Sequence, residues 1–229
     1  MIIQRTANNI KKQDGLMLLI DKPKEYTSAR VVNIVKKLLD VKKAGHSGTL
    51  DPKATGLMIV CTGSMTKFLN DLLSSDKEYE GVMIIGEKTK SFDSETQVYE
   101  TNSIEEVTEE QIRKKAEMFL GEIEQIPPMY SAIKHKGKPL YKFARKGQEL
   151  ERKPRTVLIR EFEIEKVNLP VVKFRVVCSK GTYIRTLVSD FGELLGAGAY
   201  LKELRRLRIG NYDVKDSISV EEFIDTNKN

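Results

Sequence analysis

Residues 44–61 read AGHSGTLDPKATGLMIVC, a glycine-rich segment that runs directly into a short apolar stretch. Its glycines and Pro52 exclude a regular helix over residues 44–56. The next residues, 57–61, are apolar and short, which predicts a buried strand. The sequence therefore predicts a loop that is held beside a sheet and leads into one of its strands.

Outside this segment, other short apolar runs predict further strands. They cover residues 15–20, 79–86 and 171–178. The predicted strands outnumber the helices, and the two do not alternate regularly along the chain. This pattern favours an α+β fold with a mixed or antiparallel sheet over a doubly wound parallel sheet.

Four segments have the apolar spacing of amphipathic helices. One follows the N-cap signal of Thr27 and Ser28, and another follows Thr108 and Gln111, which match a capping box. Gly121 is placed to end the second of these helices. The four segments are residues 31–39, 65–73, 112–120 and 183–195.

The composition describes a globular chain of 229 residues, with 40% hydrophobic and 31% charged residues. A chain of this length buries a core without disulfides or a structural metal. Cys61 and Cys178 lie in apolar runs and are predicted to be buried thiols in a reducing compartment. With two cysteines and two histidines, a zinc site has almost no ligands. We expect a cytoplasmic protein that binds no metal.

The net charge of +6 is concentrated in one part of the chain. Residues 134–160 hold ten basic and two acidic residues, so they carry +8 while the rest of the chain carries −2. Tyr141 and Phe143 are interleaved with these charges, and a smaller basic cluster occupies residues 202–208. A segment this basic repels itself unless an acidic partner binds, which favours nucleic acid over a merely solvated surface. Composition does not choose between RNA and DNA.

Asp51 is the candidate catalytic group of the glycine-rich segment. A hydrolase triad of His46, Ser47 and Asp51 is disfavoured, because working triads draw their members from distant parts of the chain. Asp51 is also a residue type that stabilises turns through its own backbone bonds. Pro52, however, restricts Asp51 to extended conformations and so aims its carboxylate. Both interpretations remain open at this point.

Five motifs occur in an order that resembles the TruB type of tRNA pseudouridine synthase. They are DKP (21–23), GHSGTLDPKATG (45–56), DKEY (76–79), IPPMYSAIKHKGKPLYKFARKG (126–147) and CSKGTYIRTL (178–187). The resemblance covers about residues 15–210. It implies a pseudouridine synthase fold, with a central mixed, mostly antiparallel sheet flanked by helices and loops. It also implies an isomerase that converts uridine 55 in the T-loop of tRNA to pseudouridine without a cofactor.

The resemblance assigns roles to the residues of these motifs. Asp51 matches the essential aspartate of the family, and Tyr79 matches the tyrosine that stacks on the flipped base. Arg185 matches the arginine paired with the aspartate, and Tyr183 lies beside it in the same motif. We therefore expect Arg185 to be partly buried and to have Asp51 as its carboxylate partner.

The remaining matched residues are expected to bind RNA. His46 matches the histidine that contacts RNA where the target base has left the stack, and Lys22 matches a supporting lysine at the edge of the site. Residues 125–155 match a mobile insertion that grips the T-arm of tRNA. Its candidate contacts are Lys134, Lys136, Lys138, Lys142, Arg145 and Lys146.

The chain also departs from the family pattern. Glu25 stands where glycine is usual after DKP, and Lys90 stands where an aspartate is usual, although Asp93 keeps the second acidic position. Many members continue into a C-terminal RNA-binding domain of the PUA type. We expect a short form, with a single catalytic domain over residues 1–229, no PUA domain and a monomeric state.

The reaction explains why one carboxylate is sufficient. Pseudouridine formation exchanges a C1′–N1 bond for a C1′–C5 bond with no net redox change, so it needs no cofactor. An aspartate either adds covalently or stabilises an oxocarbenium-like sugar, and both routes remain open. The alternative is a non-catalytic tRNA-binding or RNA-folding protein, which explains the basic segment but not Asp51 or Arg185. A glycoside hydrolase is disfavoured because it generally needs two carboxylates.

Overall fold

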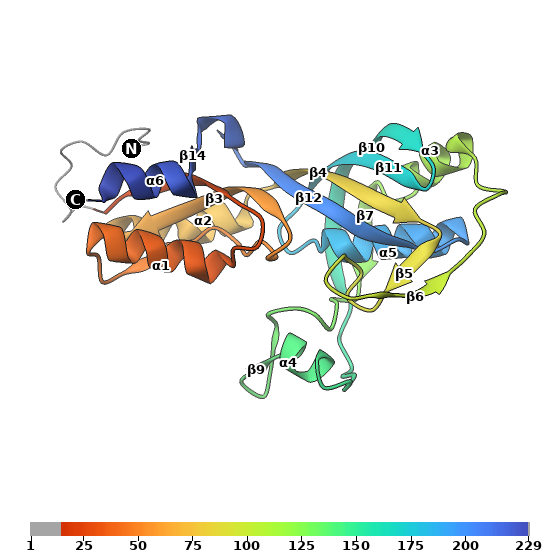
Figure 1. The fold of residues 1–229 in the computed structure, drawn as a ribbon, viewed down its shortest axis with the longest axis horizontal. Coiled ribbons are helices and arrows are strands. Elements are labelled where there is room, and N and C mark those ends of the chain that lie inside the picture. The colour runs from red at the N-terminus through yellow and green to blue at the C-terminus, as the bar shows by residue number, and fades with distance from the viewer. Residues whose placement is uncertain (1–14, 229) are drawn as a thin grey trace. The chain divides into compact units, whose positions relative to one another are not determined.

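The structure is a computed structural model that describes residues 15–228. The chain forms two compact units (Figure 1). The first unit comprises residues 1–80 and 204–229, and the second comprises residues 81–203. Two strands contribute residues to both units: β4 (Lys77–Ile85) and β12 (Ala199–Ile209).

The first unit is built on a mixed sheet with the strand order β14-β1-β3-β12. β1 is antiparallel to β3 and parallel to β14, whereas β12 runs parallel to β3 with Arg206 opposite Gly56. β2 pairs with β3 and β13 pairs with β12, both antiparallel. The strands are β1 (Met17–Lys22), β2 (Ala44–His46), β3 (Thr55–Thr62), β13 (Tyr212–Asp213) and β14 (Ile218–Ser219).

Side chains alternate between the two faces of this sheet, and residues from both faces belong to core clusters. On β1, Leu18 and Ile20 join one core cluster with residues of α1 (Ser28–Leu39) and α6 (Val220–Asn227). Met17 and Leu19 join the cluster on the other face, which includes Leu72. Leu72 belongs to α2 (Leu69–Ser74), which follows the 3-10 helix η1 (Gly63–Phe68).

The second unit has the strand order β4-β11-β10-β7, in which β10 is antiparallel to both β11 and β7. The phenylalanines Phe119, Phe162 and Phe191 pack ring against ring at centroid distances of 5.9–6.2 Å. The strands and helices are β5 (Glu87–Thr89), β6 (Val98–Thr101), α3 (Glu109–Glu117), β7 (Gly121–Gln125), β8 (Lys134–His135), β9 (Lys138–Pro139), α4 (Leu140–Ala144), β10 (Arg155–Asn168), β11 (Val171–Cys178) and α5 (Ile184–Leu195). The hairpin β8–β9 and α4 lie within residues 134–153, which we call the basic segment.

The predicted fold class is confirmed: the protein is α+β, with a mixed sheet in which most strand pairs are antiparallel. The predicted strand 171–178 is β11, and the capping box of Thr108 and Gln111 is present. Cys61 and Cys178 are buried free thiols. The single-domain expectation stays a prediction. Among residues 15–228, no helix combines the length and apolar character needed to cross a bilayer.

Two predicted helices differ from the observed ones. The helix expected over 112–120 ends at Glu117, and i→i+3 backbone bonds from the N–H groups of Met118, Phe119 and Leu120 then carry the chain to Gly121, which has φ of +92°. Leu120 is exposed. The helix expected over 65–73 consists of η1 followed by α2, so tighter 3-10 geometry replaces its first turns.

Candidate active site

The loop that carries Asp51 joins β2 to β3 and is bonded along its backbone. Ser28, at the start of α1, donates its hydroxyl to the Leu50 carbonyl (3.0 Å) and accepts the Leu50 N–H (2.9 Å). The Ala54 N–H donates to the Asp51 carbonyl (3.1 Å). These bonds fix the backbone on both sides of Asp51, which is itself partly buried. The structure therefore holds this carboxylate in place through its backbone.

Lys22 supports the same loop from the end of β1. Its side chain is fully buried, and its ammonium donates to the carbonyls of Pro23 (2.9 Å), Tyr26 (2.7 Å) and Pro52 (3.4 Å). Burial lowers the pKa of Lys22 to about 8, and the negative charge of Asp51 partly opposes this shift. The lysine thus lies close enough to Asp51 to interact with it and also contacts the residue that follows it.

His46 is half-buried at the end of β2, and its Nδ1 accepts the Gly48 N–H at 3.3 Å. Burial lowers the pKa of His46, and the positive charge of Arg206 lowers it further. Both effects favour the neutral ring at neutral pH. An Nδ1 that accepts a hydrogen bond leaves the proton of the neutral ring on Nε2.

Tyr79 lies on β4, with only 8% of its surface exposed. Two residues earlier, the buried ammonium of Lys77 donates to the carbonyls of Leu72 (3.1 Å) and Leu73 (2.7 Å) near the end of α2. These bonds anchor the beginning of the strand that carries Tyr79. The expected stacking of Tyr79 on a base stays a prediction.

Two arginines of the basic cluster at residues 202–208 are held inside the first unit. Arg205 forms a bidentate ion pair with Asp21 of the DKP motif (3.0 and 2.7 Å). Arg206 is buried and donates to two backbone carbonyls. Local composition places both in one basic cluster and does not reveal that, on β12, Arg206 is buried while Arg205 stays partly exposed.

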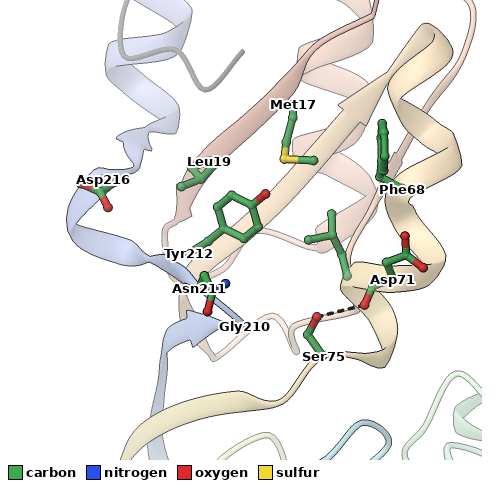
Figure 2. A pocket seen from close by; sticks show the side chains of 10 residues that line it. Met17, Leu19, Phe68, Asp71, Ser75, Gly210, Asn211, Tyr212 and Asp216 are labelled. Carbon is green, nitrogen blue, oxygen red and sulfur yellow. Dashed lines mark hydrogen bonds between the residues drawn. The ribbon is translucent and has the colours of Figure 1, made fainter. Parts of the chain in front are cut away.

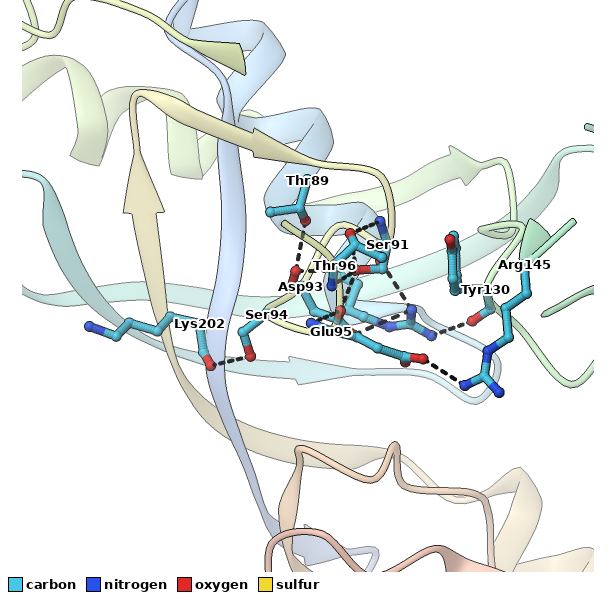
Figure 3. A network of polar contacts seen from close by, with 10 residues as sticks. Thr89, Ser91, Asp93, Ser94, Glu95, Thr96, Tyr130, Arg145 and Lys202 are labelled. Carbon is cyan, nitrogen blue, oxygen red and sulfur yellow. Dashed lines mark hydrogen bonds and ion pairs between the residues drawn. The ribbon is translucent and has the colours of Figure 1, made fainter. Parts of the chain in front are cut away.

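Arg185 lies in the first turn of α5 in the second unit and is 4% exposed. Its guanidinium donates to the carbonyls of Ser91 (3.1 Å) and Tyr130 (2.8 Å), and it lies 3.5 Å from the Asp93 carboxylate. Asp93 is buried in turn, and its Oδ1 accepts the Ser91 hydroxyl (2.6 Å) and the Glu95 N–H (2.9 Å). Figure 3 shows this network around Ser91 and Asp93.

The predicted burial of Arg185 is confirmed. Within the second unit its carboxylate partner is Asp93, while its pairing with Asp51 stays a prediction. The sequence comparison had noted Asp93 only as a retained acidic position. Tyr183 is the N-cap residue of α5, where its N–H donates to the side chain of the buried Gln125 at 3.1 Å.

The basic segment, residues 134–153, contrasts with these buried groups. Its candidate contacts Lys134, Lys136, Lys138, Lys142, Arg145 and Lys146 are all exposed. Arg145 pairs with Glu95 at 2.9 Å (Figure 3). No ion pair within residues 15–228 involves the five lysines. Their ammonium groups therefore face solvent.

A separate pocket of about 880 Å³ lies in the first unit between β1, α2 and residues 210–216 (Figure 2). Met17, Leu19 and Tyr212 contribute apolar surface to it, and Asp71 and Asp216 lie at its edge. None of the predicted site residues lines this pocket. Its position therefore separates it from the Asp51 loop.

The family described as TruB family pseudouridylate synthase (N terminal domain) matches residues 36–184, which include Asp51, Tyr79 and Tyr183. A second family, described as tRNA pseudouridylate synthase B C-terminal domain, matches residues 185–229. With this fold and an aspartate held in the family's motif, the chain is a pseudouridylate synthase, an isomerase. It belongs to the TruB family.

Curated relatives support this assignment over nearly the whole chain. A protein of Flavobacterium johnsoniae named tRNA pseudouridine synthase B is 48% identical over 217 residues, which cover 92% of this chain and 95% of that protein. A protein of Phocaeicola vulgatus with the same name is 46% identical and is covered to 92%. A Burkholderia pseudomallei protein of that name is 48% identical but is covered to only 68%.

Solved structures show the same fold. A chain of a Cbf5-Nop10-Gar1 complex superposes with a TM-score of 0.71 at 32% identity, over 93% of this chain and 54% of that one. A chain of an H/ACA RNP bound to a substrate RNA containing 2′-deoxyuridine gives a TM-score of 0.68 at 30% identity, over 91% and 52%. This chain thus spans about half the length of these two structural relatives.

Proposed function

We propose that this protein converts uridine 55 in the T-loop of tRNA to pseudouridine, with Asp51 as its catalytic carboxylate. The observation that carries the proposal is the backbone-fixed position of Asp51 within the matched family motif. Relatives of nearly the same length named tRNA pseudouridine synthase B support tRNA as the substrate.

The reaction begins when the target uridine leaves the base stack, because a paired and stacked base is out of reach. Tyr79 supplies an aromatic face for the extruded base, a contact worth about 1–3 kcal/mol. Asp51 acts at C1′ as the C1′–N1 bond breaks. The uracil then turns, C5 bonds to C1′ and loses its proton, and N1 gains one. No atoms or electrons are exchanged overall, so neither a metal nor a cofactor is required.

Arg185 is proposed to form an ion pair with the Asp51 carboxylate and to stabilise its negative charge. Its side chain is buried and is held by the Ser91 and Tyr130 carbonyls, which leaves its guanidinium little freedom. The Asp93 carboxylate lies 3.5 Å from the Arg185 guanidinium and partly neutralises its positive charge. Asp93 therefore weakens the attraction between Arg185 and Asp51. A buried arginine with fixed donors stabilises an anion without reorganising during the reaction.

The basic segment is proposed to grip the T-arm. Five exposed lysines and Arg145 supply the positive charge that RNA phosphates neutralise, and Tyr141 and Phe143 lie among them. Phosphate contacts of this kind release counterions, so affinity depends on salt. His46 is proposed to contact the RNA beside the flipped base, and the buried Lys22 is proposed to support the loop that carries Asp51. We further propose that the protein acts in the cytoplasm as a monomer.

The test is incubation with an unmodified tRNA transcript, followed by mapping of pseudouridine along the RNA. We expect pseudouridine at one position of the tRNA, nucleotide 55, and no pseudouridine in a transcript that carries cytidine at that nucleotide. The alternative of a non-catalytic tRNA-binding protein predicts binding of both transcripts with no pseudouridine in either. Modification at a different uridine would retain the enzyme class and overturn the proposed target.

A further inference from the structure

Arg206, on β12, is the largest fully buried side chain of the described residues, with 1% of its surface exposed. No ion pair within residues 15–228 joins it to a carboxylate. Burying a guanidinium without such a partner is costly, and an apolar side chain of similar volume would avoid that cost. The position of Arg206 therefore calls for an explanation beyond packing.

The contacts of Arg206 join Gly48, near the start of the Asp51 loop, to Leu57 of β3, shortly after the loop ends. Its Nε donates to the Leu57 carbonyl at 2.7 Å, and its terminal nitrogen donates to the Gly48 carbonyl at 3.2 Å. Leu57 and Gly48 lie on opposite sides of Asp51 in the sequence. A guanidinium offers several donors in a rigid planar fork, so one side chain bridges both carbonyls. A lysine ammonium at the same place has no such fork.

The backbone of β3 just before Leu57 also lies very close to the backbone of Arg206. Gly56 lies opposite Arg206 in the parallel pairing of β3 with β12. A Cβ at Gly56 would lie 2.2 Å from the Arg206 carbonyl oxygen, and Gly56 has φ of +103°. Both facts require glycine here. The close approach brings the Arg206 side chain within reach of the loop.

We propose that Arg206 is a positioning residue for pseudouridine formation: its guanidinium bridges the Gly48 and Leu57 carbonyls and so fixes where the Asp51 carboxylate lies. This inference rests on the proposed function. Ser28 and Lys22 hold the middle of the loop, at Leu50 and Pro52. Arg206 joins Gly48 to Leu57 of β3, which those residues do not contact. Displacing a catalytic group by about 1 Å lowers rates by up to about 100-fold.

The experiment compares Arg206→Met and Arg206→Lys with the wild-type chain. Arg206→Met removes both the charge and the bridge, whereas Arg206→Lys keeps the charge and loses the fork. The matched control is Arg113→Met in the second unit, which also removes a guanidinium bond to a backbone carbonyl, that of Ile164 (2.6 Å). The single-turnover rate at saturating tRNA and the tRNA dissociation constant are measured for each.

We expect both Arg206 variants to lose about 10- to 100-fold in single-turnover rate while their tRNA affinity stays within about threefold of wild type. Arg113→Met should retain the wild-type rate. If Arg206→Met does not fold, Arg206→Lys decides, because it keeps the charge and the stem. A wild-type rate in Arg206→Lys would show that the bridge is dispensable and would overturn the inference.

A second measurement separates the charge from the bridge. The chain has two histidines, so an NMR titration resolves His46 from His135. Because the charge of Arg206 lowers the pKa of His46, Arg206→Met should raise that pKa and Arg206→Lys should leave it unchanged. An unchanged pKa in Arg206→Met would place the guanidinium away from the loop and count against the inference. If the wild-type chain forms no pseudouridine, the proposed function fails, whatever the variants do.

Discussion

The Asp51 loop and the basic segment are both irregular parts of the chain, but the protein treats them in opposite ways. Buried side chains from three elements bond the loop: Lys22 from β1, Ser28 from α1 and Arg206 from β12. The regular structure of the basic segment is a hairpin of two two-residue strands and a five-residue helix. Its lysine ammonium groups are exposed.

The difference indicates that a fixed position is needed at the catalytic loop, whereas exposed and adaptable charges suit the RNA-binding segment. Chemistry at C1′ requires a carboxylate that does not move, since rates fall steeply when reacting groups are misplaced. Phosphate contacts tolerate movement because a lysine ammonium is a point charge on a flexible stem. We therefore expect changes in the loop to act on rate and changes in the basic segment to act on affinity.

The largest effect should come from Asp51→Asn, which keeps the shape of the loop and removes its negative charge. We expect single-turnover activity to fall by about 1,000-fold or more, because no other group on this loop can replace the carboxylate at C1′. tRNA binding should remain within about threefold of wild type. Turnover within an order of magnitude of wild type would show that the loop does not carry the chemistry.

Tyr79→Leu removes an aromatic face from the strand that Lys77 anchors. Loss of base stacking, about 1–3 kcal/mol, should lower the single-turnover rate by about 10- to 100-fold while tRNA still binds. Tyr99→Leu is the control, since Tyr99 is exposed on β6 outside the site. Equal rates for wild type and Tyr79→Leu would assign Tyr79 to the core alone.

The buried ammonium of Lys22 should make the stability of the first unit depend on pH. The folded pKa is about 8 against 10.5 in the unfolded chain, so the unfolded state binds more protons between these values. The free energy of unfolding should therefore rise with pH across this window, by about 1–3 kcal/mol for this one group.

Urea unfolding of wild type and Lys22→Met at pH 7.5 and pH 10 measures that contribution as a difference. The free energy of unfolding of wild type minus that of Lys22→Met should increase from pH 7.5 to pH 10. Lys24→Met, at an exposed neighbouring lysine, should show no such growth. A difference that does not change with pH would mean that Lys22 is solvated in solution.

The smallest expected effect is that of the triple variant Lys134→Ala, Lys136→Ala and Lys138→Ala. We expect tRNA affinity to fall about tenfold at moderate salt, and the slope of log affinity against log salt to fall by about 0.7–0.9 for each lost phosphate contact. The rate of bound tRNA should be nearly unchanged. Replacing Lys114, Lys166 and Lys173, exposed lysines on α3, β10 and β11, is the control. An unchanged slope in the first variant would reduce the basic segment to a solvated surface.

Sequence patterns anticipated much of the fold and several site residues. The alternation in β11, the Thr27 cap of α1 and the capping box of α3 depend on residues a few positions apart, which local sequence records. The candidate residue Asp51 is recognisable from local sequence because Pro52 restricts its backbone and the flanking glycines allow a ligand to approach closely. The end of α3 falls at Glu117 rather than at Leu120 because the last turn before Gly121 has i→i+3 bonds in place of α-helical ones.

Local sequence is sufficient to predict the periodicities, the caps, the basic segment and the motif that holds Asp51, since all of these depend on neighbouring residues. Which polar groups leave water depends instead on contacts between distant parts of the chain. Arg206 meets Leu57, and Arg185 meets Ser91, across 149 and 94 residues. Partners so far apart in the sequence become neighbours only when the strands and helices pack together. Arginines that look alike in the sequence therefore become a surface ion pair at Arg145 and a buried bridge at Arg206.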